Sequence, residues 1–204
     1  MTILNGLKNM MFNQILSISK KIIILIIISC CWIFSLEAQT DSGMMLFPIQ
    51  WLGIWEGELQ IYKGQEVVQK VPMRVDNLGT DNPDVYIWAL TYGPDTIAGR
   101  RNYLLKAKDK SRGVWEVDEQ NGIFLEGKVV GNTFINVFSV MENTLMSSMS
   151  VENDETMKFE IIVYTKESTS KTGDLVHEGE NIPAVFSYSI TGYQKAVLKK
   201  VRNP

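Results

Sequence analysis

The sequence contains very little cysteine and histidine. Its 204 residues include two cysteines, Cys30 and Cys31, and one histidine, His177. Both cysteines lie in the first forty residues, and loss of that segment would leave no cysteine for a disulfide, a zinc site or a nucleophile. A Cys–His or Ser–His catalytic group is therefore not expected, and we predict neither catalytic residues nor a cofactor.

The chain also lacks a basic stripe, a glycine-rich phosphate loop and, after residue 40, a convincing amphipathic helix. Lys and Arg together number 20 and Asp and Glu 23, a net charge of −3. A mildly acidic chain of this kind argues against a nucleic acid as partner. With 45% hydrophobic and 21% charged residues, the composition is that of a globular protein and excludes a disordered chain.

No apolar run is long enough to span a membrane, which needs roughly 20 residues. Residues 22–34 form a shorter run that follows Lys20 and Lys21 and is broken only by a serine. This pattern predicts a signal peptide over residues 1–38, cleaved after Ala38, with residues 39–50 as a segment before the folded domain. The mature chain would then keep 17 basic and 22 acidic residues, a net charge of −5.

Two alternatives for this leader remain open. Ile27-Ile28-Ser29-Cys30 resembles a bacterial lipobox, in which Cys30 would be acylated and would attach the protein to the outer membrane. The leader could also stay uncleaved as an anchor. If the segment is instead a cleaved signal peptide, the protein is exported to the periplasm or the extracellular space. Membrane attachment is expected only if Cys30 is lipidated.

From Trp51 onward, apolar and polar residues alternate with the period of two that is typical of strands. Tight turns such as Asn121-Gly122 and Gly131-Asn132 separate the strands. This order predicts an all-β fold and a single domain over residues 51–204. We expect an antiparallel up-and-down barrel of about 8–10 strands, with a two-sheet sandwich as the alternative. The polar stretch Lys166–Asn181 is expected to be a long loop.

The first predicted strand carries the motif Gly53-Ile54-Trp55-Glu56-Gly57. It resembles the G-x-W opening of lipocalins and the W-x-G opening of the fatty-acid-binding and nitrobindin branches of the calycin superfamily. The resemblance implies a lipocalin-like barrel in which Trp55 seals the closed end. It also implies a basic residue near the last strand stacked on that indole, here Lys199, Lys200 or Arg202.

Four residues are candidates for ligand binding: Tyr86, Trp88, Arg101 and Tyr103. Tyr86 and Trp88 share one face of a predicted strand with further apolar residues, and Tyr103 falls on the next strand. This aromatic face either lines a ligand cavity or is packed core. Arg101 lies two residues before Tyr103 and so shares its face of the predicted strand. It either clamps a ligand carboxylate or ends the strand in water.

Metal binding has only weak candidates. His177 lies in an acidic segment that could form an oxygen-plus-imidazole metal site or supply an axial haem ligand, although a solvated loop is the simpler interpretation. Methionine clusters can bind copper, but flexible packing is the simpler interpretation here too. The cluster consists of Met141, Met146, Met149 and Met157. We therefore predict no metal ligand.

Together these patterns predict an exported lipocalin-like protein that binds or carries a small ligand, mostly apolar or carboxylated. The alternative is an interaction module of the cell envelope with a filled barrel and no ligand. An enzyme that uses barrel-lining carboxylates is a third hypothesis. A continuous cavity lined by Trp88, Arg101 and Tyr103 would favour the carrier, and a solid interior would favour the interaction module.

Overall fold

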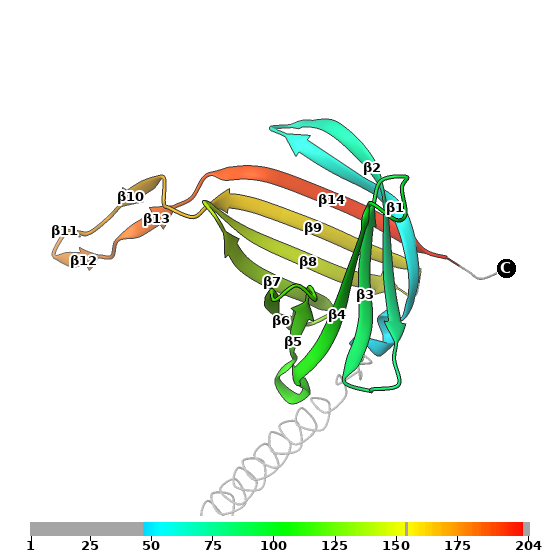
Figure 1. Cartoon of the computed structure of the whole chain (residues 1–204). Coiled ribbons are helices and arrows are strands. Elements are labelled where there is room, and N and C mark those ends of the chain that lie inside the picture. The colour runs from blue at the N-terminus through cyan, green and yellow to red at the C-terminus, as the bar shows by residue number, and fades with distance from the viewer. Residues whose placement is uncertain (1–46, 154, 202–204) are drawn as a thin grey trace, which may run out of the picture. The chain divides into compact units, whose positions relative to one another are not determined.

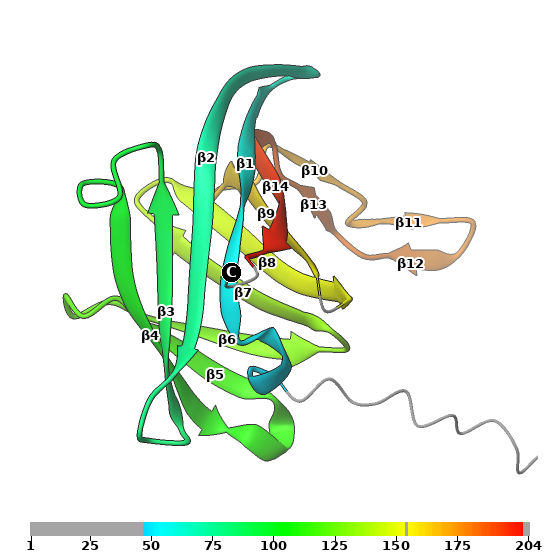
Figure 2. The same cartoon turned by 90° about the vertical axis from the view of Figure 1, so that its right-hand side faces the viewer.

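The barrel predicted from the alternation is confirmed. A computed structural model describes residues 47–153 and 155–201, and within them ten antiparallel strands close into a barrel in the order β1-β14-β9-β8-β7-β6-β5-β4-β3-β2. Each strand pairs with its neighbour in sequence, apart from the closing strand β14, which lies between β9 and β1 (Figure 1, Figure 2). The strands are β1 (Gly53–Lys63), β2 (Glu66–Gly79), β3 (Val85–Tyr92), β4 (Arg100–Asp109), β5 (Val114–Asp118), β6 (Phe124–Val130), β7 (Thr133–Val140), β8 (Asn143–Asn153), β9 (Thr156–Thr165) and β14 (Ile190–Lys200).

The expected leader over residues 1–38, its Cys30 and most of the segment 39–50 lie outside the described residues, and so does Arg202. None of the helices in the described ranges has the length and apolar character needed to cross a membrane.

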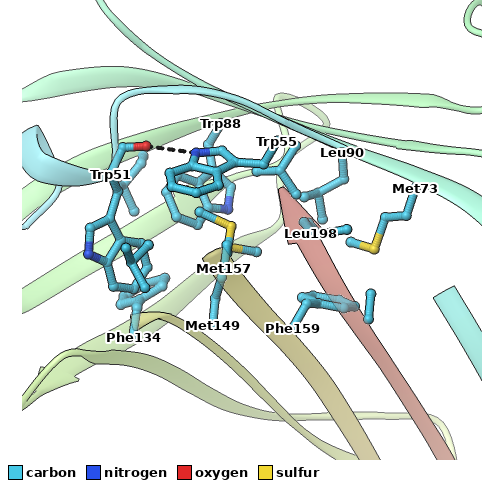
Figure 3. Packing of buried hydrophobic residues seen from close by; sticks show 14 of the residues in the cluster. Trp51, Trp55, Met73, Trp88, Leu90, Phe134, Met149, Met157, Phe159 and Leu198 are labelled. Carbon is cyan, nitrogen blue, oxygen red and sulfur yellow. Dashed lines mark hydrogen bonds between the residues drawn. The ribbon is translucent and has the colours of Figure 1, made fainter. Parts of the chain in front are cut away.

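Alternate side chains of every barrel strand point into the lumen. The lower half of the lumen, next to the segment that precedes β1, is filled, and its closed end is here called the floor. Trp55 and Leu198 are fully buried there and Leu59 nearly so. Figure 3 shows Trp55 and Leu198 packed with two methionines, Met149 and Met157. Burial of such large side chains is the main term that stabilises a barrel without disulfides.

The segment before β1 completes this core, which the strand pattern did not predict. A short 3-10 helix, Ile49–Trp51, turns the chain into the barrel, and Trp51 is fully buried. The ring of Phe47 lies 4.7 Å from that of Trp51 and 5.1 Å from that of Phe134, measured between centroids. Trp55 Nε1 donates a hydrogen bond of 2.9 Å to the carbonyl of Trp51 (Figure 3). The barrel floor is therefore made of aromatic rings from both sides of the turn into β1.

The opening motif has the geometry that the resemblance implies. Lys200, opposite Trp55 in the β1–β14 ladder, places its Nζ 5.0 Å from the centroid of the Trp55 ring. Gly53 has a φ of +140°, and a Cβ at that position would lie 2.6 Å from the Lys200 side chain. Glycine thus leaves space for the cation that covers the indole. Lys199 instead donates to Thr156.

The outer face of the barrel carries charged pairs. The Asp76 carboxylate is nearly buried between Arg74 and Arg100, which donate to its two oxygens at 2.6 and 2.5 Å. The hydrogen bond that Arg74 donates to Asp76 is the largest cause of a raised pKa of Arg74. The charges therefore satisfy one another outside the lumen, as expected for outward positions of an antiparallel barrel.

The prediction of a loop over Lys166–Asn181 is wrong for half of its length. The chain forms a two-stranded arm, in which β10 (Ser170–Thr172) pairs with β13 (Val185–Ser187) and β11 (Leu175–His177) pairs with β12 (Glu180–Ile182). Glu178 and Gly179 both have positive φ, which is the backbone that a two-residue hairpin turn needs. The polar composition concealed this hairpin because neither face of the arm is buried. The arm extends beyond the barrel strands (Figure 1).

Candidate ligand-binding site

The upper half of the lumen is hollow. A cavity of about 160 Å³ lies above the aromatic floor. Its wall includes Trp88, Leu90, Phe134, Met149 and Phe159, which Figure 3 shows grouped around the buried core. The other residues that border it are Tyr92, Tyr103, Val117, Glu119, Leu125, Asn136, Phe138, Ser147, Ser148 and Ile161. The site is thus mostly apolar, with a few polar groups, as is usual for small-molecule pockets.

A cross-strand row forms one side of the cavity. Trp88 and Tyr103 are partners in the β3–β4 ladder. In the next ladder Leu104 pairs with Asp118, so the neighbouring position brings Glu119 opposite Tyr103. The Glu119 backbone is held there because its N–H donates to the carbonyl of Ile123 at 3.0 Å. An indole, a phenol and a carboxylate therefore lie side by side along this wall.

The adjoining wall, formed by β6 and β7, is shaped by a glycine and an asparagine. The β6–β7 ladder ends where Gly127 pairs with Asn136, and the Asn136 amide continues the connection by donating to the Glu126 carbonyl at 3.1 Å. A Cβ on Gly127 would lie 2.5 Å from the Phe134 ring. Gly127 therefore lets Phe134 reach the floor and leaves the space above it open.

Two of the four candidates from the sequence border the cavity. Trp88 is buried and Tyr103 half-buried in its wall. Tyr86 lies lower in the lumen, where its ring is 6.0 Å from that of Trp115. Arg101 is exposed, and its Nη1 donates to the carbonyls of Ala98 and Arg100 at 3.1 and 3.2 Å. Tyr86 and Arg101 are therefore outside the cavity wall.

Sequence reasoning missed Glu119 and Asn136. Glu119 follows Trp115 and Val117 at every second position, and both of these side chains point inward and are buried. The alternation alone could therefore have placed Glu119 in the lumen. Its neighbours Glu116 and Asp118 point outward and pair with Lys108 and Lys106. Asn136 lies between Phe134 and Phe138 on the same face of β7, and both of these border the cavity, so the alternation could have placed it there too.

The charges of Glu119 and Arg101 affect the ionisation of the tyrosines that border the cavity. The pKa of Tyr103 is raised from its ordinary value, chiefly by burial and then by the negative charge of Glu119, while Arg101 acts in the opposite direction. Burial also raises the pKa of Tyr92, and there too Arg101 opposes the shift. Glu119 is thus close enough to Tyr103, and Arg101 to both phenols, to affect their ionisation.

The Tyr103 phenol provides a test of this arrangement. We expect Glu119→Gln to lower the pKa of Tyr103, because tyrosinate would no longer face a carboxylate. We expect Arg101→Ala to raise it, because a stabilising cation is lost. NMR titration of the labelled Tyr103 ring carbon measures both shifts. Shifts of the same sign in the two variants would contradict the placement.

The weak metal candidates do not come together in the described structure. His177 lies in the arm with a 70% exposed side chain, 3.9 Å from Glu178. Met149 and Met157 are packed in the core, whereas Met141 is exposed. In the described ranges, no three His, Cys, Asp or Glu residues are grouped so that they could hold a metal ion.

Comparisons with known proteins bear on the fold. No family model matches the chain, and no curated protein matches it significantly. Among solved structures, it is similar to a protein of unknown function from the DUF3598 family of Nostoc punctiforme, with a TM-score of 0.51 and 9% identity. The match covers 75% of this chain and 48% of the other, so this chain spans about half of that protein's length. At this identity the likeness concerns the fold alone: the chain is a closed ten-strand antiparallel barrel that shares its architecture with a DUF3598 protein.

Proposed function

We propose that this protein binds a small, mostly apolar ligand in the upper lumen of its barrel and carries it without chemical change. The observation that supports this is the cavity of about 160 Å³ above a solid aromatic floor. An engineered cavity of roughly 150 Å³ is large enough for benzene. The ligand would therefore place one ring, or a short aliphatic segment, inside the wall.

A carrier fits the site better than an enzyme does. Among the described residues that border the cavity, Glu119 is the single carboxylate. General acid–base catalysis by carboxylates typically uses two groups with different pKa values. The cavity therefore supports the binding hypothesis rather than the third hypothesis, an enzyme with paired lumen carboxylates.

Export and kinship with the calycins belong to the same proposal. The apolar run after Lys20 and Lys21 supports a leader cut after Ala38, with the lipobox at Cys30 as the alternative. The Trp55–Lys200 contact supports a lipocalin-like barrel. Native mass spectrometry of protein from its own host would report both a processed or acylated N-terminus and any ligand retained during purification.

Filling the cavity tests the binding proposal. Ser147 lies on an inward position of β8 and borders the cavity, and its ladder partners are Asn136 and Ile161. In the full chain, Ser147→Leu should weaken binding of 2-phenylethanol, measured by calorimetry, by about tenfold or more. Ser139→Leu, on an exposed position of β7, is the matched control and should bind like the wild type. Equal affinity in both variants would overturn the proposal.

The interaction module has one observation in its favour. The arm exposes large apolar side chains, among them Val176, Val185 and Phe186. A two-stranded ribbon is only marginally stable alone and has free edges, so a second copy of the chain, paired arm to arm, is the partner that fits this alternative. Light scattering decides: a dimer that Phe186→Ser converts to monomer would favour it, and a monomeric wild type would exclude it.

A further inference from the structure

We propose that the lumen selects a small organic cation, an amine on an apolar body, with Glu119 as its counter-charge. This inference rests on the proposed function and names the ligand class. It departs from the carboxylated ligand that Arg101 suggested in the sequence.

The first argument is the sign of the charge at the wall. Glu119 is the one charged side chain among the described residues that border the cavity. Its hydrogen-bond partner there is the neutral Asn121 amide, whose Nδ2 lies 3.3 Å from Glu119 Oε2. The carboxylate is therefore not neutralised by that contact. A ligand cation that displaces water from it would form a charge-assisted hydrogen bond, which is stronger than a neutral one.

The second argument is the orientation of the nearby cation. Arg101 is exposed, and its Nη1 donates to two backbone carbonyls, those of Ala98 in the β3–β4 connection and Arg100 at the start of β4. A carboxylate in the cavity would meet Glu119 at the wall without Arg101 beside it. Glu119 opposes formation of tyrosinate at Tyr103, whereas Arg101 favours it there and at Tyr92 from outside the cavity wall.

The third argument is the aromatic lining. Six of the fifteen residues that border the cavity carry aromatic rings: Trp88, Tyr92, Tyr103, Phe134, Phe138 and Phe159. The faces of such rings attract cations. Asn136 adds to this preference, because its amide nitrogen is held by backbone carbonyls and the group left for a ligand is an acceptor. Carboxylate, rings and acceptor together favour a protonated amine.

Three probes with one apolar body and different end groups test the inference: 2-phenylethylamine, 2-phenylethanol and phenylacetate. The amine is protonated at pH 7, as a lysine side chain is. Calorimetry on the full chain should give an affinity about tenfold higher for the amine than for the alcohol, and weaker binding still for phenylacetate. Because the attraction is partly electrostatic, higher salt should reduce the amine's advantage.

Two variants assign the effect to its residue. Glu119→Gln keeps the shape and removes the charge, so it should abolish the amine's advantage and leave the alcohol within about twofold of wild type. Glu142→Gln, at an exposed turn position, is the matched control and should keep the wild-type order.

Each outcome is decisive. Equal binding of amine and alcohol by the wild type would overturn the cation inference and leave the binding proposal standing. An amine preference that survives in Glu119→Gln would overturn the role of Glu119. If none of the probes binds and Ser147→Leu changes nothing, the binding proposal itself fails.

Discussion

Replacing Trp55 with alanine should lower the free energy of unfolding by about 3–5 kcal/mol, the range typical of large-to-small substitutions in a core. The indole is fully buried and forms the centre of the floor. Its loss removes dispersion contacts, leaves a cavity and deprives the carbonyl of Trp51 of its donor. It also removes the ring over which Lys200 lies. Urea-induced unfolding of the full chain, followed by circular dichroism, measures the change.

Two controls separate these contributions. Trp55→Phe keeps a ring but loses the hydrogen bond, so it should cost less than the alanine variant and more than a surface change. Ile97→Ala, at a side chain that is 89% exposed in the β3–β4 connection, should stay within about 0.5 kcal/mol of wild type. A Trp55→Ala variant as stable as Ile97→Ala would show that the indole does not seal the barrel.

The sequence predicted the parts of the fold that alternation and the opening motif encode. Period two identified the barrel strands, and Trp55, which the resemblance to calycins placed at the closed end, is fully buried in the lumen. A basic residue near the last strand was expected to cover the indole, and Lys200 does so. These features are local or depend on one ladder, so the residues carry them directly.

The rest depended on long-range packing. Phe47 reaches the floor from before the first strand, and no periodicity marks it because it belongs to no strand. The arm was missed because both of its faces are exposed, so it lacks the alternation that burial imposes. The position of Arg101 left two alternatives open, a ligand clamp or a strand end in water; near the start of β4 its exposed side chain donates to the carbonyl of Ala98. The cavity charge comes from Glu119, one position past the end of β5.

Gly57, the final glycine of the opening motif, should tolerate no side chain. A Cβ on Gly57 would lie 2.4 Å from the backbone carbonyl oxygen of Val197 and 3.0 Å from the Leu198 side chain. Val197 and Leu198 belong to β14, so the close approach lies at the seam where the last strand closes on the first. A backbone carbonyl in a ladder cannot move as a flexible side chain can. We therefore expect Gly57→Ala to lower the free energy of unfolding by about 2–3 kcal/mol through overpacking.

Gly79→Ala is the matched control, because a Cβ there meets nothing within 4 Å and its φ is not positive. It should leave the free energy of unfolding within about 0.5 kcal/mol of wild type. Amide hydrogen exchange shows where the barrel is weakened. In Gly57→Ala, the amides of the β1–β14 pairs beside Val197 should lose protection first, while those of the β8–β9 ladder stay protected. Uniform loss of protection across both ladders, or a Gly57→Ala variant as stable as the control, would contradict the view that this glycine closes the barrel. In that case the W-x-G spacing would need another explanation than the approach of β14 to β1.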